Sequence, residues 1–228
     1  MTVVMDLAIK RILKQKLTLF VVFAIPLFLI IVPAPTEEMF SMRYGLFGLL
    51  LFFSAFLLSK QIIDDRSQKT VVRIAASPLS HKAYLAGHLM SYFLVIALQS
   101  IFFFLINLIL ASEGLTFNLI ALSLYLFMGV LSLSFSLLWH TFFKSYATSM
   151  ALFAVIVNIF ALLGGLTVPV SMMPEPMQRV VVVIPAYWYS FGLEQAYLES
   201  YLNVVLSLLI LLVFAIIFLT IGSKRRFE

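Results

Sequence analysis

The chain has 228 residues, of which 63% are hydrophobic and 11% are charged, and its mean hydropathy is +1.12. Apolar runs near the length that crosses about 30 Å of hydrocarbon recur along it, so the composition predicts an integral membrane protein. The length holds roughly six spans of about 20 residues with short loops, which excludes an additional soluble catalytic domain. The absence of cysteine excludes disulfides and thiolate metal sites.

The N-terminal segment predicts a helix that lies on the membrane surface. Asp6, Lys10 and Lys14 recur four residues apart and share one helical face, whereas apolar residues such as Ile9 and Ile12 lie largely on the opposite face. This pattern is typical of an amphipathic helix in the inner membrane interface. A basic anchor that only sets the topology explains the same charges.

Six hydrophobic runs follow, and they predict six transmembrane helices. They cover residues 17–32, 44–59, 84–111, 119–139, 148–166 and 201–221. Backbone groups in lipid must bond to one another, which leaves helices or a closed barrel. Barrel strands alternate polar and apolar residues, and these runs are apolar on all sides. We therefore expect an all-α integral membrane protein with one transmembrane domain over residues 1–228.

The positions of Lys and Arg predict the orientation. If the N-terminus is inside, the inner segments hold every basic residue except Arg43 and Arg179. Lys and Arg bias a loop toward the cytoplasm, so both termini and the loop between the second and third runs are expected there, with the chain in the cell membrane. The net charge of +5 then reflects topology and gives no support to nucleic-acid binding.

The loop between the second and third runs, "SKQIIDDRSQKTVVRIAASPLSHKAYLAG" at residues 59–87, gathers many of the chain's charges. From Asp65 to Ala76 it predicts a helix of about three turns, which Ser77 and Pro78 end. Its apolar residues are Val71, Val72 and Ile74. A half-apolar helix in the cytoplasm indicates a docking element, with a solvated hairpin or a helix on the bilayer surface as the alternatives.

The segment between the fifth and sixth runs predicts a re-entrant structure in the outer leaflet. Residues 167–200 are too apolar for an ordinary loop, and prolines divide them into pieces too short to span. Irregular backbone at that depth must be covered by protein or line a cavity. We therefore expect this segment to cap the outer end of a dimer, with a lipid-facing hairpin as the alternative.

Two of these segments resemble the type-2 ABC exporter permeases. The first cytoplasmic loop of that family commonly has the pattern E-R-E-x-G-T, followed by a short helix and A-S-P. Asp65, Arg66, Thr70 and "AASPLS" at residues 75–80 match it, whereas Ser67 and Lys69 replace the usual second acid and glycine. The second segment, "GGLTVPVSMMPEPMQRVVVVIPAYWYSFGLEQA" at residues 164–196, is similar to the family's glycine pair, proline-containing stretch, basic residue and P-x-Y motif.

The resemblance implies a membrane subunit of an ATP-driven exporter. Two permease chains, identical or homologous, would form the path, and two copies of a separate ABC ATPase, carrying ATP and Mg, would bind under residues 60–82. This chain has no G-x-x-x-x-G-K-[ST] loop, so we expect no catalytic residue, no cofactor and no metal site in it. The expected ATPase-coupling residues are Asp65, Arg66, Thr70, Val71, Val72, Arg73, Ile74 and Pro78. The expected outer gate residues are Gly164, Gly165, Pro169, Pro174, Arg179, Pro185 and Tyr187.

Polar residues inside the runs are few. Asn107 and Asn158 predict interhelical hydrogen bonds or the lining of a path. No Asp, Glu, Lys or Arg lies deep in a run, which disfavours an ion-coupled secondary carrier. The alternatives to an exporter permease are an ion-coupled secondary carrier and a non-transporting assembly or immunity protein. Small outer loops and Phe-rich runs favour a hydrophobic drug, a peptide antibiotic or a lipid as cargo, and membrane lipid as a partner.

Overall fold

The computed structural model describes residues 2–31, 37–67, 81–110 and 113–224. Every regular element in these ranges is helical. The elements are α1 (Thr2–Lys14), α2 (Lys16–Ile31), α3 (Glu37–Ser67), α5 (His81–Leu110), α6 (Leu115–His140), α7 (Tyr146–Leu163), η1 (Val170–Met172), α8 (Glu175–Val180), η2 (Val181–Val183), α9 (Pro185–Tyr197) and α10 (Tyr201–Lys224). The all-α fold class is thus confirmed for the described residues.

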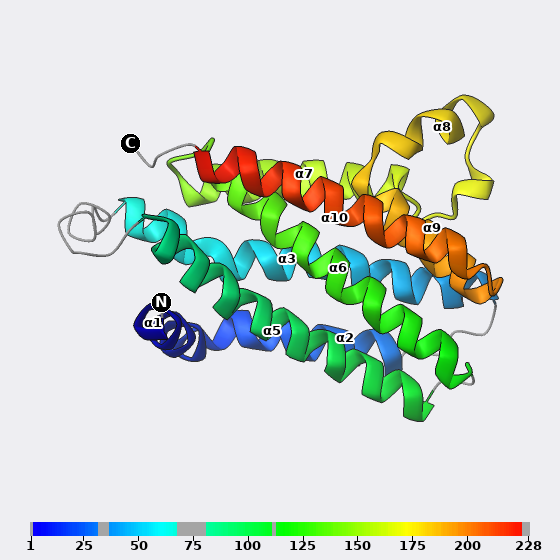
Figure 1. The fold of residues 1–228 in the computed structure, drawn as a ribbon, viewed down its shortest axis with the longest axis horizontal. Coiled ribbons are helices and arrows are strands. Elements are labelled where there is room, and N and C mark those ends of the chain that lie inside the picture. Colours follow the sequence, from blue (N-terminus) through cyan, green and yellow to red (C-terminus); the bar gives the residue numbers. More distant parts are fainter. Residues whose placement is uncertain (1, 32–36, 68–80, 111–112, 225–228) are drawn as a thin grey trace.

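The long helices lie side by side in an elongated bundle, with α6 near its centre (Figure 1). α6 packs against α3, α5, α9 and α10, which explains why it has a long row of buried residues. Aromatic side chains fill much of the core. The rings of Phe47 on α3 and Phe103 on α5 stack with centroids 3.9 Å apart, and Tyr125 of α6 meets both edge to face.

Within the described residues, five helices are long and apolar enough to cross a membrane. They cover Met42–Asp65, Ala83–Ile109, Leu115–His140, Tyr146–Leu163 and Tyr201–Ser223. The first predicted span corresponds to α2, which has only 16 residues and reaches the required length only together with α1. The expected six spans therefore become five, or six when the bent pair of α1 and α2 counts as one.

The predicted N-terminal amphipathic helix is present as α1. It packs on α5, with Ala8 and Ile12 buried, while Asp6 and Lys10 form an exposed ion pair 2.6 Å long. Around Gln15 the chain turns by 76° into α2. This bend sets α1 across the direction of the neighbouring span, which is the geometry of a helix on a membrane surface; the surface position itself stays a prediction.

The segment after α7 is divided where its prolines stand. Pro169 and Pro174 directly precede η1 and α8, and Pro185 is the first residue of α9, a position that suits proline because its missing N–H has no helical partner. α8 projects from one end of the bundle, and α9 returns to pack on α6 and α10 (Figure 1). No residue of η1 or α8 is buried. Entry of this segment into the membrane stays a prediction.

Candidate coupling site at the end of α3

A buried carboxylate joins three helices where α3 ends. The side chain of Asp65 is 7% exposed, and its oxygens accept hydrogen bonds from Nη1 of Arg11 at 3.0 and 3.2 Å. The hydroxyl of Tyr84 donates to the same carboxylate at 2.6 Å. Because Arg11 lies on α1 and Tyr84 on α5, one side chain of α3 holds the ends of two other helices.

The pairing follows from the cost of burying a charge. A carboxylate leaves water only when charged or polar donors replace its hydration, and hydrogen bonds between charged groups are the strongest of these. Arg11 comes from the last turn of α1 and Tyr84 from the first turn of α5, so both can reach Asp65 at one end of the bundle. We call Arg11, Asp65 and Tyr84 the Asp65 network.

Further polar contacts extend the network along α5. The ring of His88 lies 4.5 Å from the ring of Tyr84, and its Nδ1 is 2.9 Å from the hydroxyl of Tyr92. The Ser91 hydroxyl donates to the carbonyl of Met5 at 3.3 Å, which ties α1 to α5 a second time. The position of α1 is therefore set by several hydrogen bonds as well as by apolar packing.

A second buried polar cluster connects α3 with α6. The hydroxyl oxygen of Ser59 lies 2.6 Å from that of Ser136 and 2.8 Å from Nε2 of His140. The ring of Phe56 covers His140 at a centroid distance of 4.7 Å. Both polar clusters lie toward the same end of α3, so this end of the bundle is held by directional bonds.

Sequence reasoning missed most of these residues. Arg11 and Tyr84 gave no signal, because they meet Asp65 from segments remote along the chain. Ser136 and His140 stand four residues apart on α6, and this spacing was a visible sign of a shared polar face. Ser59, their partner on α3, was not recognisable from spacing.

The predicted coupling residues are only partly described. Thr70, Val71, Val72, Arg73, Ile74 and Pro78 lie outside the described residues. Asp65 and Arg66 belong to α3, which continues to Ser67, so the separate helix expected from Asp65 onward does not begin there. Asp65, one of the residues expected to contact an ATPase, is buried within this chain.

The structure brings part of the predicted outer gate together. Gly164 ends α7 against the start of α9, where a β-carbon would lie 2.7 Å from that of Ala186. Gly165 has a φ of 79°, a conformation that favours glycine. Pro185 is buried beside this contact, and the ring of Tyr187 stacks on Phe191. Three further gate residues, Pro169, Pro174 and Arg179, lie in the projecting part of the segment.

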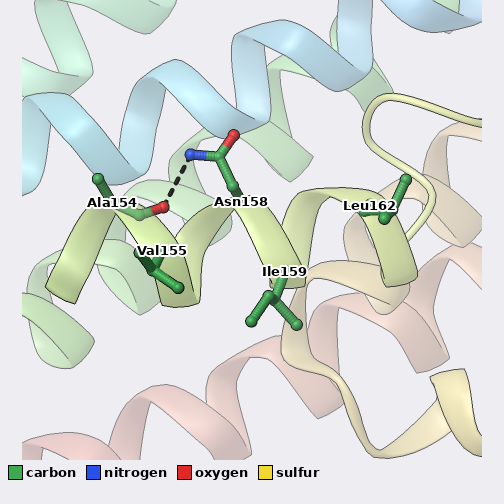
Figure 2. Close-up of a pocket in the computed structure, with 5 residues that line it drawn as sticks. All are labelled: Ala154, Val155, Asn158, Ile159 and Leu162. Carbon is green, nitrogen blue, oxygen red and sulfur yellow. Dashed lines mark hydrogen bonds between the residues drawn. The ribbon is translucent and has the colours of Figure 1, made fainter. Parts of the chain in front are cut away.

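The two asparagines have opposite environments. Asn107 is fully buried; its Nδ2 donates to the carbonyl of Phe103 at 2.8 Å, and its Oδ1 has no partner among the described residues. Asn158 is exposed and donates to the carbonyl of Ala154 at 2.7 Å. Figure 2 shows it in a shallow groove whose other lining residues are Ala154, Val155, Ile159 and Leu162. Neither amide bonds to another helix in these contacts, so a role in lining a path stays a prediction.

The layout agrees with the comparison to known families. The sequence model described as "ABC-2 family transporter protein" matches residues 5–224, which covers the helices from α1 to α10. No curated protein matches the chain. Members of this family are membrane subunits that associate with a separate ABC ATPase. The chain belongs to the ABC-2 family of transporter permeases.

Proposed function

We propose that this chain is the membrane subunit of an ATP-driven exporter, in which two permease chains enclose a path and two copies of an ABC ATPase bind at the cytoplasmic side. The observation that carries the proposal is the family match over residues 5–224. Hydrophobic drugs, peptide antibiotics and lipids are the proposed cargo, because the spans are apolar and rich in Phe and the path must be lined by them.

The Asp65 network gives the proposal a route for mechanical coupling. α3 ends at Ser67 and α5 begins at His81, and residues 68–80 join them. Tyr84 and Asp65 fix these two helix ends to each other at 2.6 Å. A displacement that an ATPase imposes on residues 68–80 therefore acts on α3 and α5 together. ATP binding would close the ATPase pair, tilt the two permease halves and open the path outward.

The exposed face of α7 supports a dimer. The side chains of Val155, Ile159 and Leu162 are each more than two-fifths exposed. Lipid is sufficient to cover these apolar side chains. Asn158 lies on the same helix; its Nδ2 donates to the carbonyl of Ala154, but the amide is exposed, and polar atoms that face hydrocarbon without a further partner are costly. A second permease chain supplies such a partner across a two-fold axis. We therefore place the permease contact at the groove shown in Figure 2.

The outer segment is proposed to gate the path. Its prolines divide it into short helical pieces, and α9 connects it to the packed core through Tyr189, whose hydroxyl donates to the carbonyl of Tyr44 at 2.9 Å. A rearrangement of α3 therefore reaches this segment directly. This contact is the physical basis for linking the two ends of the bundle.

Co-purification with the ATPase tests the function. Replacing Ile74 with Asp places a charge in the proposed docking helix, and loss of one buried aliphatic side chain should weaken docking by about one to two decades. Val183→Asp is the matched control, because Val183 is an exposed apolar residue at the opposite end of the bundle. ATPase loss with Ile74→Asp alone supports the proposal. Retention of the ATPase at unchanged affinity by Ile74→Asp contradicts it.

A further inference from the structure

The outward face of α1 and the first residues of α2 carry a mixture of basic and apolar residues. Lys10, Arg11, Lys14 and Lys16 are all exposed, and we call them the cationic face. Leu7, Leu13 and Leu17 are interleaved with them and are 54%, 61% and 76% exposed. Asp6 is the one acid among residues 2–31, and it pairs with Lys10.

We propose that the cationic face binds the headgroup of an anionic phospholipid, and that Arg11 divides its guanidinium between this headgroup and Asp65. The first part follows from charge complementarity, since four basic side chains stand within seven residues. The interleaved leucines identify the source of the anion. A soluble phosphate leaves them in water, whereas a bilayer takes them into its acyl region while the lysines extend to the headgroups.

The geometry of Arg11 supports the second part. Both of its hydrogen bonds to Asp65 come from a single nitrogen, Nη1, and its side chain is 49% exposed. A guanidinium has five N–H donors arranged in a planar fork, which suits a carboxylate and a phosphate at the same time. Asp65, in contrast, is 7% exposed and cannot reach a headgroup. Arg11 is therefore the link between the bilayer and the end of α3.

The consequence is a competition between lipid and protein for one side chain. A headgroup that draws Arg11 outward weakens its bonds to Asp65, and this loosens α1 from α3 next to residues 68–80. The inference rests on the proposed function for its orientation, because the cationic face must lie at the cytoplasmic leaflet. The lipid composition of the membrane would then change how firmly α1 is held to the end of α3, beside the residues through which an ATPase is proposed to act.

Native mass spectrometry of the full chain in detergent micelles tests the binding. The probe is phosphatidylglycerol, with phosphatidylcholine as the neutral comparison. Each basic residue near an anionic surface is worth about fivefold in affinity, so Lys14→Gln with Lys16→Gln should weaken phosphatidylglycerol binding about 25-fold at low salt. Lys144→Gln is the matched control, because Lys144 is exposed at the same end of the bundle but lies far along the chain from α1. Equal losses in the double variant and the control, or no loss in either, would overturn the proposal.

Asp65→Asn separates a shared Arg11 from simple surface attraction. The amide keeps the shape of the carboxylate but releases the charge of Arg11 to the lipid, so the affinity for phosphatidylglycerol should rise several-fold while that for phosphatidylcholine stays unchanged. An unchanged or lower affinity for phosphatidylglycerol overturns the sharing of Arg11. These measurements need no ATPase, so their failure is distinguishable from failure of the Ile74→Asp experiment.

Discussion

Removing Arg11, the half-exposed partner in the Asp65 network, should lower the free energy of unfolding more than removing the charge of the buried Asp65. Arg11→Met removes the guanidinium but keeps an apolar stem of similar length, and it leaves the carboxylate of Asp65 buried with Tyr84 as its remaining donor. Asp65→Asn leaves Arg11 half exposed and hydrated, and the amide oxygen still accepts a hydrogen bond. The difference arises because only the carboxylate has lost its contact with water.

The magnitudes follow from the burial of each partner. Removing one partner of a fully buried ion pair costs about 3–5 kcal/mol. Arg11 is 49% exposed and Tyr84 remains bonded, so we expect Arg11→Met to lower the free energy of unfolding by about 2 kcal/mol. Asp65→Asn should cost about 1 kcal/mol. The double variant should cost no more than Arg11→Met alone, because the uncompensated charge is then absent.

Reversible unfolding in mixed micelles with increasing sodium dodecyl sulfate provides the measurement, followed by the fluorescence of Trp139 and Trp188. Lys10→Met is the matched control, since Lys10 is also a basic residue of α1 with an acidic partner, but both members of its pair are more than half exposed. Such pairs contribute about 0–1 kcal/mol. Equal losses for Arg11→Met and Lys10→Met, or costs that add in the double variant, would refute the buried-carboxylate reasoning.

Two further predictions concern topology and packing. Single cysteines placed at Glu37 and Gln68 of this cysteine-free chain should be labelled in intact cells by an impermeant maleimide only at position 37, because the basic loops predict residue 68 inside; labelling only at 68 would invert the topology. Gly45→Ala should destabilise the chain by about 1–3 kcal/mol, because a β-carbon there overlaps a backbone carbonyl of the segment after α7. Gly114→Ala, which meets nothing within 4 Å, is the control, and equal unfolding midpoints for the two variants would contradict this packing argument.

The helices were predictable because the runs are apolar on every side, and lipid leaves such segments no other hydrogen-bonded form. The end of α3 was not. The second hydrophobic run was predicted to end at Ser59, before Lys60, yet α3 continues to Ser67. Asp65 lies buried in this continuation and is paired with Arg11, 54 residues earlier in the chain, and no local pattern carries that information.

In the outer segment, too, the local sequence predicted where helices begin, whereas their packing depends on residues remote along the chain. Its prolines predicted where helices begin, because proline restricts its own backbone and removes a donor. The return of α9 to the core was not predictable, since it depends on Tyr189 reaching the backbone of Tyr44 and on the close approach of Gly48 to the Tyr189 ring. The signal available was the pair of glycines on α3, three residues apart, which lets another element approach the helix closely.

The two ends of the bundle are held by different forces, and this difference indicates how the chain can move. At the end of α3 near Ser67, α1, α3 and α5 share a carboxylate, so a relative shift of these helices breaks bonds to a buried charge. At the other end, Gly45 and Gly164 permit close contacts between backbone surfaces. Apolar helices gain little from the hydrophobic effect within lipid, so such contacts can slide at low cost as long as packing is kept. We therefore expect α1, α3 and α5 to move as one unit, and the segment from Gly164 to α9 to adjust its packing while the hydrogen bond from Tyr189 to the carbonyl of Tyr44 keeps it joined to α3.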